Sequence, residues 1–167
     1  MAATVVISEF NGAGETETDN ITNTNMGSND SVNLDPDTYP VVPGENTYEK
    51  WQKIKVTAMG GSSIIDNLKV WRDGALGGSA VHVTNARESA YGGAETFAQP
   101  IATASSIADQ TMPTSEPTGA NLGIGGALDG ELTTTGVSDY LVHQIQTDAG
   151  DVEGSTSTLY YQYDETA

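Results

Sequence analysis

The sequence contains no cysteine among its 167 residues, which excludes disulfide bonds, thiol chemistry and cysteine-ligated metal centres. It also has no basic N-terminal region and no long apolar run, so neither a signal peptide nor a transmembrane helix is expected. We therefore expect a protein that is made in a cytoplasm and that needs neither covalent cross-links nor a membrane to fold.

Basic residues are almost as scarce, with six lysines and arginines against 23 acids and a net charge of −17. A chain this acidic is repelled by nucleic acid and by anionic membranes, and neither is expected as a partner. All six bases lie between Lys50 and Arg87, where only Asp66 and Asp73 oppose them. Such a basic segment marks an interaction surface, or it neutralises acidic loops of the same chain. Both interpretations stay open.

The chain has 19 glycines, many threonines and serines, and no stretch rich in helix-forming residues, a composition that favours strands and turns. Alternating apolar residues predict strands at 4–10, 48–59, 63–72, 80–84, 137–147 and 157–164, with an irregular or bulged strand at 121–132. Residues 1–167 are expected to form one all-β domain. The architecture expected is an antiparallel β-sandwich, loosely immunoglobulin-like or jelly-roll-like, of about seven or eight strands. Long loops are predicted at about 11–46 and 85–118.

The clearest pattern predicts a central hairpin whose turn is Gly60–Ser62. One face of this hairpin is apolar and includes Ile54 opposite Leu68. The other face would place Trp51 beside Trp71 and Lys53 beside Lys69. Those aromatic and basic side chains suit a protein partner or a sugar ring, although the same face could instead be buried under a second sheet or a loop. The partner-binding residues predicted from this hairpin are Trp51, Lys53, Lys55, Lys69, Trp71 and Arg72.

No motif points to catalysis. The only histidines, His82 and His143, each fall within an expected strand and are interpreted as packing residues. Two histidines without cysteine make a weak case for zinc, and no nucleophile motif accompanies them. The glycine-rich run 119–126 lacks the Gly-Lys-Ser/Thr ending of a phosphate-binding loop. We expect a protein that is not an enzyme.

Calcium is the one cofactor with a candidate site. Asp30, Asn33, Asp35 and Asp37 offer hard oxygen ligands at close spacing in the first long loop, and Glu15, Glu17 and Asp19 form a second set. Neither set fits the EF-hand pattern. The alternative is an ordinary solvated loop, and no other cofactor is expected.

Four segments resemble small β-rich structural proteins of phages and prophages: Trp51–Val56, Asp66–Trp71, Ala108–Pro117 and Tyr160–Glu165. The resemblance implies a virion structural protein, of which a capsid decoration (cement) or head accessory protein is the main expectation. It also implies the major capsid protein or another virion subunit as partner, many copies or a homo-oligomer such as a trimer, and residence in the virion after synthesis in a host cytoplasm. The alternative function is a carbohydrate-binding or host-attachment module that uses the tryptophans.

Overall fold

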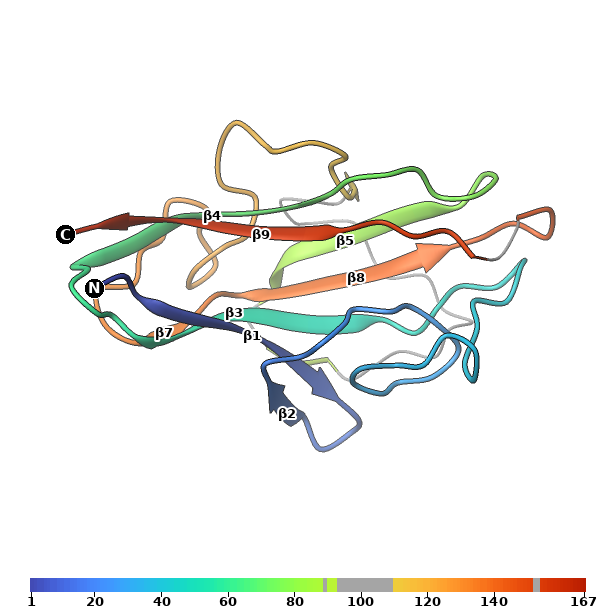
Figure 1. The fold of residues 1–167 in the computed structure, drawn as a ribbon, viewed down its shortest axis with the longest axis horizontal. Coiled ribbons are helices and arrows are strands. Elements are labelled where there is room, and N and C mark those ends of the chain that lie inside the picture. The colour runs from blue at the N-terminus through green and yellow to red at the C-terminus, as the bar shows by residue number, and fades with distance from the viewer. Residues whose placement is uncertain (89, 93–109, 152–153) are drawn as a thin grey trace.

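The computed structural model describes residues 1–88, 90–92, 110–151 and 154–167, and this part of the chain forms nine β-strands and no helix. It follows that no described helix could cross a membrane. In chain order the strands are β1 (Thr4–Asn11), β2 (Thr16–Asp19), β3 (Lys50–Ala58), β4 (Ile64–Arg72), β5 (Val81–Glu88), β6 (Gln110–Thr111), β7 (Gly136–Val137), β8 (Tyr140–Gln146) and β9 (Leu159–Thr166) (Figure 1).

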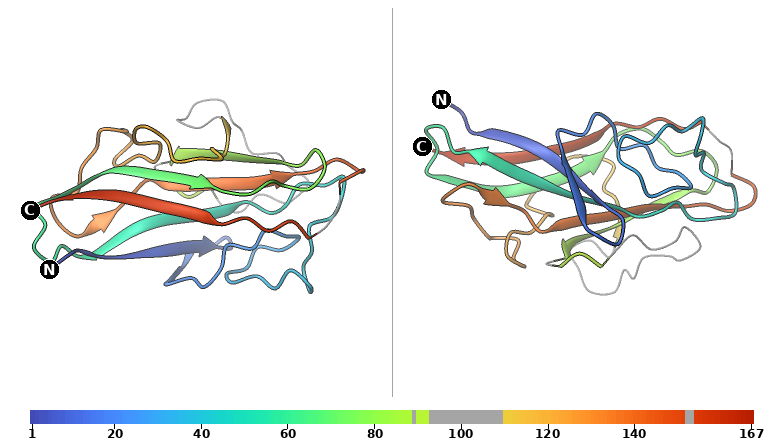
Figure 2. Two further views of the ribbon diagram at one scale, coloured as in Figure 1. Left: turned by 45° about the horizontal axis from the view of Figure 1, so that its top comes forward. Right: turned by 90° about the horizontal axis from the view of Figure 1, so that it is seen from below.

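The strands form two antiparallel sheets. The large sheet has the order β2-β1-β3-β8-β5-β6, with β7 also paired to β3, and the small sheet consists of β4 and β9 alone. The small sheet packs over the middle of the large one (Figure 2). The expected all-β sandwich is therefore confirmed. It has nine strands rather than seven or eight, because two of them are only two residues long.

The main core lies between the two sheets. Ile54 and Val56 of β3 and Leu141 of β8 face Leu68 and Val70 of β4, and all five are at most 2% exposed. Burying one such side chain contributes roughly 1.5–3 kcal/mol. The alternation read from the sequence thus identified the right core face of both central strands.

The prediction of a central hairpin is wrong. β3 pairs with β1, β7 and β8, whereas β4 pairs with β9 in the other sheet. Residues 59–63 carry the chain from one sheet to the other. Gly60 adopts a φ of 61°, and a Cβ there would lie 2.3 Å from the Ala2 carbonyl oxygen. Ile54 and Leu68 consequently face each other across the sandwich instead of lying side by side. Alternation alone could not distinguish these arrangements, because both bury the same faces.

The glycine-rich segment expected to form a strand at 121–132 is not one. It contains the short bridge Ile124–Ala127 and covers the outer edge of β4. The Asn121 side chain accepts a hydrogen bond from the Val70 amide at 2.7 Å and donates one to the Val70 carbonyl at 2.8 Å. The first expected long loop does contain a strand, β2. In the second, β5 extends to Glu88, and 89 and 93–109 lie outside the described residues.

Candidate functional site: a polar cleft over a buried histidine pair

A cleft of about 810 Å³ opens at one end of the sandwich. Its floor is formed by the inner face of β5 and β8, and β9 contributes one wall. Loop residues 21–26, 36–41, 76–80 and 154–158 supply much of the remaining lining. That lining mixes threonine, serine and asparagine side chains with about as many apolar ones. It includes the carboxylates of Asp37 and Asp151, and no lysine or arginine in the described part of the chain lines it.

His82 of β5 and His143 of β8 lie together in the floor of this cleft. Strand pairing places His82 opposite Ile145 and Thr84 opposite His143, so the two rings are diagonal neighbours on one face. The Nε2 atom of His82 lies 2.8 Å from the Nδ1 atom of His143. Both histidines are buried, as expected for packing residues, but they also form a hydrogen-bonded pair.

A chain of hydrogen bonds fixes the tautomers of this pair. Glu9 accepts a hydrogen bond from Gln52 Nε2 at 3.0 Å, which directs Gln52 Oε1 away from the carboxylate. That oxygen lies 3.1 Å from His143 Nε2 and accepts a second bond from the Tyr161 hydroxyl at 2.5 Å. His143 must therefore carry its proton on Nε2 and accept at Nδ1, so His82 donates from Nε2. The Nδ1 atom of His82 is left as a bare acceptor, with no partner among the described residues.

The chain of hydrogen bonds ends in a buried ion pair. Lys50 Nζ lies 2.7 Å from Glu9 Oε1, and the two side chains are only 1% and 0% exposed. The ammonium also donates to the carbonyl of Ser31 at 2.6 Å. Such a pair is tolerated in an interior only when its remaining hydrogen bonds are satisfied, and Gln52 and Ser31 fulfil that condition here.

The histidines are neutral at physiological pH. Burial, together with the nearby Arg72 charge, lowers the pKa of His82 to about 3. Burial also takes the pKa of His143 well below its usual value, helped by His82 and Lys50. A nitrogen this weakly basic is a poor proton acceptor in catalysis at pH 7, but it can still accept a hydrogen bond from a ligand.

The two tryptophans are separated by the sandwich. Trp51 is 6% exposed in a cluster on the outer face of the large sheet, where its ring lies 5.4 Å from that of Tyr140. Trp71 lies on the small sheet and stacks on Tyr160 with ring centroids 5.1 Å apart and planes at 10°. The predicted tryptophan pair therefore does not form.

Every basic side chain described by the structure is engaged within its own chain. Lys55 binds Glu17 and Asp19, each at 2.9 Å, and Lys69 binds Glu116 at 2.9 Å. The remaining two interact with an aromatic ring and with the backbone: Lys53 Nζ lies 3.8 Å from the centre of the Tyr140 ring, and Arg72 donates to the carbonyl of Gly74. The partner-binding role predicted for these residues stays a prediction. They lie in two different sheets and do not form one surface.

The loop oxygens proposed for calcium already accept hydrogen bonds from the chain. Asp30 accepts from Asn11 Nδ2 at 2.7 Å and from the Gly12 amide at 2.6 Å, and Asp35 accepts from the Asp37 amide at 3.0 Å. Asn33 accepts from the amides of residues 22 and 23. Among the residues that the structure describes, no group of three or more His, Asp or Glu is arranged to hold a metal ion.

Searches against protein families, curated proteins and solved structures find no match to this chain. Its site is therefore defined by geometry alone. The network of Glu9, Gln52 and the two histidines was missed in the sequence because it joins four strands, β1, β3, β5 and β8, that are separated along the chain. The available signal was the presence of Glu9 and Lys50 inside otherwise apolar strands, since buried charges in strands require partners.

Proposed function

We propose that this chain is a non-enzymatic virion structural protein that coats the outer surface of a viral shell, as a capsid decoration or head accessory protein. It would be present there in many copies, bound to the major capsid protein or to another virion subunit. The proposal rests on the sequence resemblance described above and on one feature of the structure, the internal use of the described basic side chains.

Because the described lysine and arginine side chains contact groups of their own chain, the exterior is left strongly acidic. Of the 23 acids, few are neutralised by ion pairs in the described part of the chain. An acidic exterior repels DNA and other copies of the chain in free solution, while it favours a cationic protein surface. An outer layer on a particle requires these properties, because it must bind shell subunits and avoid nucleic acid.

We expect the protein to co-purify with density-gradient-purified virions at a fixed ratio to the major shell protein, measured by quantitative mass spectrometry. Because attachment to a cationic surface is screened by salt, the ratio should fall when intact particles are washed with about 1 M NaCl. Absence of the chain from particles, or a ratio that varies between preparations, would contradict the proposal.

A second function is favoured by the cleft. Its hydroxyl and amide side chains, the acceptor nitrogen of His82 and the apolar side chains of Ile145 and Leu159 suit a polyhydroxylated ligand without negative charge, such as a neutral glycan. For the carbohydrate-binding alternative, we therefore propose the cleft rather than the tryptophans as the site.

A glycan microarray followed by calorimetry would test this second function. If the cleft is the site, His82→Phe should weaken binding at least about tenfold, the cost of one lost hydrogen bond to a buried group. Trp71→Ala serves as the matched control, because it removes an aromatic ring distant from the cleft. Loss of binding in W71A with retention in H82F would instead place the glycan on the Trp71–Tyr160 stack.

A further inference from the structure

We infer that the open side of the sandwich, between β1 and β9, is an acceptor site for an extended segment of a basic protein partner, which adds as a third strand to the small sheet. This inference rests on the proposed function, for which it supplies the attachment site. We call this side the β1–β9 groove and define it by Val5, Ile7, Ile54, Tyr161 and Tyr163.

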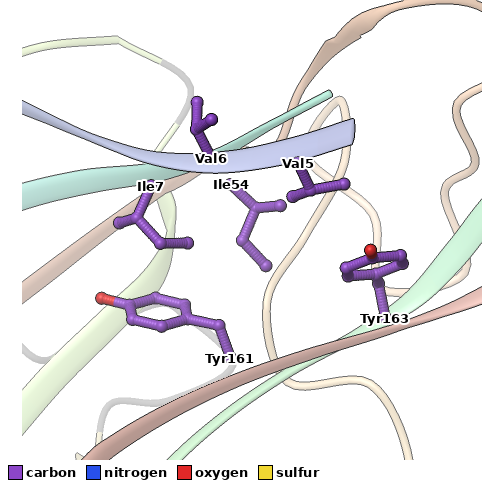
Figure 3. Close-up of a pocket in the computed structure, with 6 residues that line it drawn as sticks. All are labelled: Val5, Val6, Ile7, Ile54, Tyr161 and Tyr163. Atoms are coloured by element: carbon purple, nitrogen blue, oxygen red, sulfur yellow. The ribbon is translucent and has the colours of Figure 1, made fainter. Parts of the chain in front are cut away.

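The first observation is a gap in the apolar layer. A cavity of about 330 Å³ lies between the two strands. Val5 and Ile7 of β1 and Ile54 of β3 point toward β9, from which Tyr161 and Tyr163 point back toward them (Figure 3). Val5, Ile7 and both tyrosines are only half-buried. The small sheet is thus too narrow to cover the inner face of β1.

The second observation is an unpaired strand edge. The outer edge of β4 is covered, because the Asn121 side chain, the Leu132 backbone and the Pro113 carbonyl all hydrogen-bond to it. No strand or loop in the described ranges makes backbone hydrogen bonds to the opposite edge of β9. Natural proteins usually protect such edges with proline, lysine or bulges, and residues 159–163, Leu-Tyr-Tyr-Gln-Tyr, contain no proline or lysine.

The groove is long enough for a strand. The small cavity and the cleft share Ile7 and Tyr161, so they lie next to each other along β9. The eight residues of β9 span about 26 Å at about 3.3 Å per residue. A segment of about eight residues could pair along this edge, with alternate apolar side chains entering the cavity.

Charge identifies the occupant as a foreign and basic segment. Asp164 and Glu165 lie at one end of β9, while Asp37 and Asp151 line the cleft at the other end. No described lysine or arginine lines either cavity. A second copy of this chain is a poor donor, because residues 1–49 and 88–167 contain no lysine or arginine. The strands between them, β3, β4 and β5, are already paired or covered on both edges.

The probe for this site is a synthetic eight-residue peptide, capped at both ends, in which lysine and valine alternate. We expect it to bind and to slow hydrogen exchange at the β9 amides. A matched peptide with serine in place of valine should not. In the protein, Val5→Trp fills the groove and should weaken binding at least tenfold. Val6 also borders the cavity, but its side chain points away from β9 (Figure 3), so Val6→Trp should leave binding unchanged. Thermal melts establish that both variants are folded.

Three results would overturn the inference: no binding at about 1 mM peptide, a limit of about −4 kcal/mol; binding without protection of β9; or equal weakening by V5W and V6W. The outcome is separable from that of the particle experiment. If the chain is present in virions at a fixed ratio but binds no peptide, only the inference about the β1–β9 groove fails. If the chain binds the peptide through β9 but is absent from virions, the inference about the groove stands and the proposed function fails.

Discussion

At pH 4.5 the folded protein should be less stable than at pH 7.5 by at least about 3 kcal/mol, because two buried histidines resist protonation. Each has a folded pKa below its unfolded value of 6.5, with that of His82 lowered to about 3. Between these values the unfolded chain binds more protons than the folded one, so stability is complete above about pH 7 and falls with pH. At pH 4.5, two units below the unfolded pKa, His82 alone contributes about 3 kcal/mol at 1.36 kcal/mol per unit, and His143 acts in the same direction. Urea unfolding at several pH values measures this.

A variant with one titrating group fewer provides the control. His82→Gln should be less stable than the wild type at pH 7.5, because the hydrogen bond to His143 is weakened. Its stability should nevertheless change less than that of the wild type between pH 7.5 and 4.5, because only His143 still resists protonation. The carboxylates whose pKa is lowered, such as Asp19 and Asp151, also make the fold less stable in acid, but only near and below about pH 4. Equal wild-type stability at pH 7.5 and 4.5 would contradict this account.

The sequence was most informative about elements whose identity is a local property. Strands β3, β4 and β9 were predicted nearly to their ends, because alternation of apolar and polar residues is written into each segment. The bulge in β4 was not predicted. Asn67 adopts a φ of 48° between Asp66 and Lys69, where the pairing shifts, and the shift buries Ile65 instead of Ile64. An asparagine in the left-handed region is permitted but is not obligatory, so the bulge could not be predicted from the presence of Asn67.

The alternation of apolar and polar residues could not decide which strands pair with each other. The choice between a β3–β4 hairpin and two separate sheets depends on whether β1 and β9 compete for the edges of these strands. β1 pairs with β3 over seven positions, and β9 pairs with β4 over a similar length. The candidate site could not be predicted for the same reason, because it depends on which strands are neighbours. His82, His143 and Gln52 meet only because β3, β8 and β5 are neighbours in the large sheet, a relation between segments that single-segment periodicity does not contain.

Replacing Glu9 by glutamine should destabilise the protein by about 3–5 kcal/mol at pH 7.5, the usual cost of leaving one member of a buried ion pair without its counter-charge. The uncompensated charge would be that of Lys50, which is 1% exposed and keeps only the Ser31 carbonyl as a charge-stabilising partner. The measurement is the free energy of unfolding in urea. The double variant with Lys50→Met should recover most of the loss, because it removes the buried charge as well.

Glu17→Gln is the matched control for this prediction, since it breaks an ion pair of the same type in solvent. Lys55 and Glu17 are 27% and 38% exposed, and exposed pairs contribute less than about 1 kcal/mol. A further readout separates the network from the charge alone. Without the carboxylate, the remaining partners of Gln52 include the hydroxyls of Thr24 and Tyr161, which can either donate or accept. The histidine ring nitrogens should then show mixed tautomers by ¹⁵N NMR, whereas E17Q should keep the single pattern. If E9Q lowers the free energy of unfolding no more than E17Q does, then Lys50 must reach solvent or another acceptor when residue 9 is neutral. The Glu9 carboxylate would then not be the group that fixes the protons of His82 and His143.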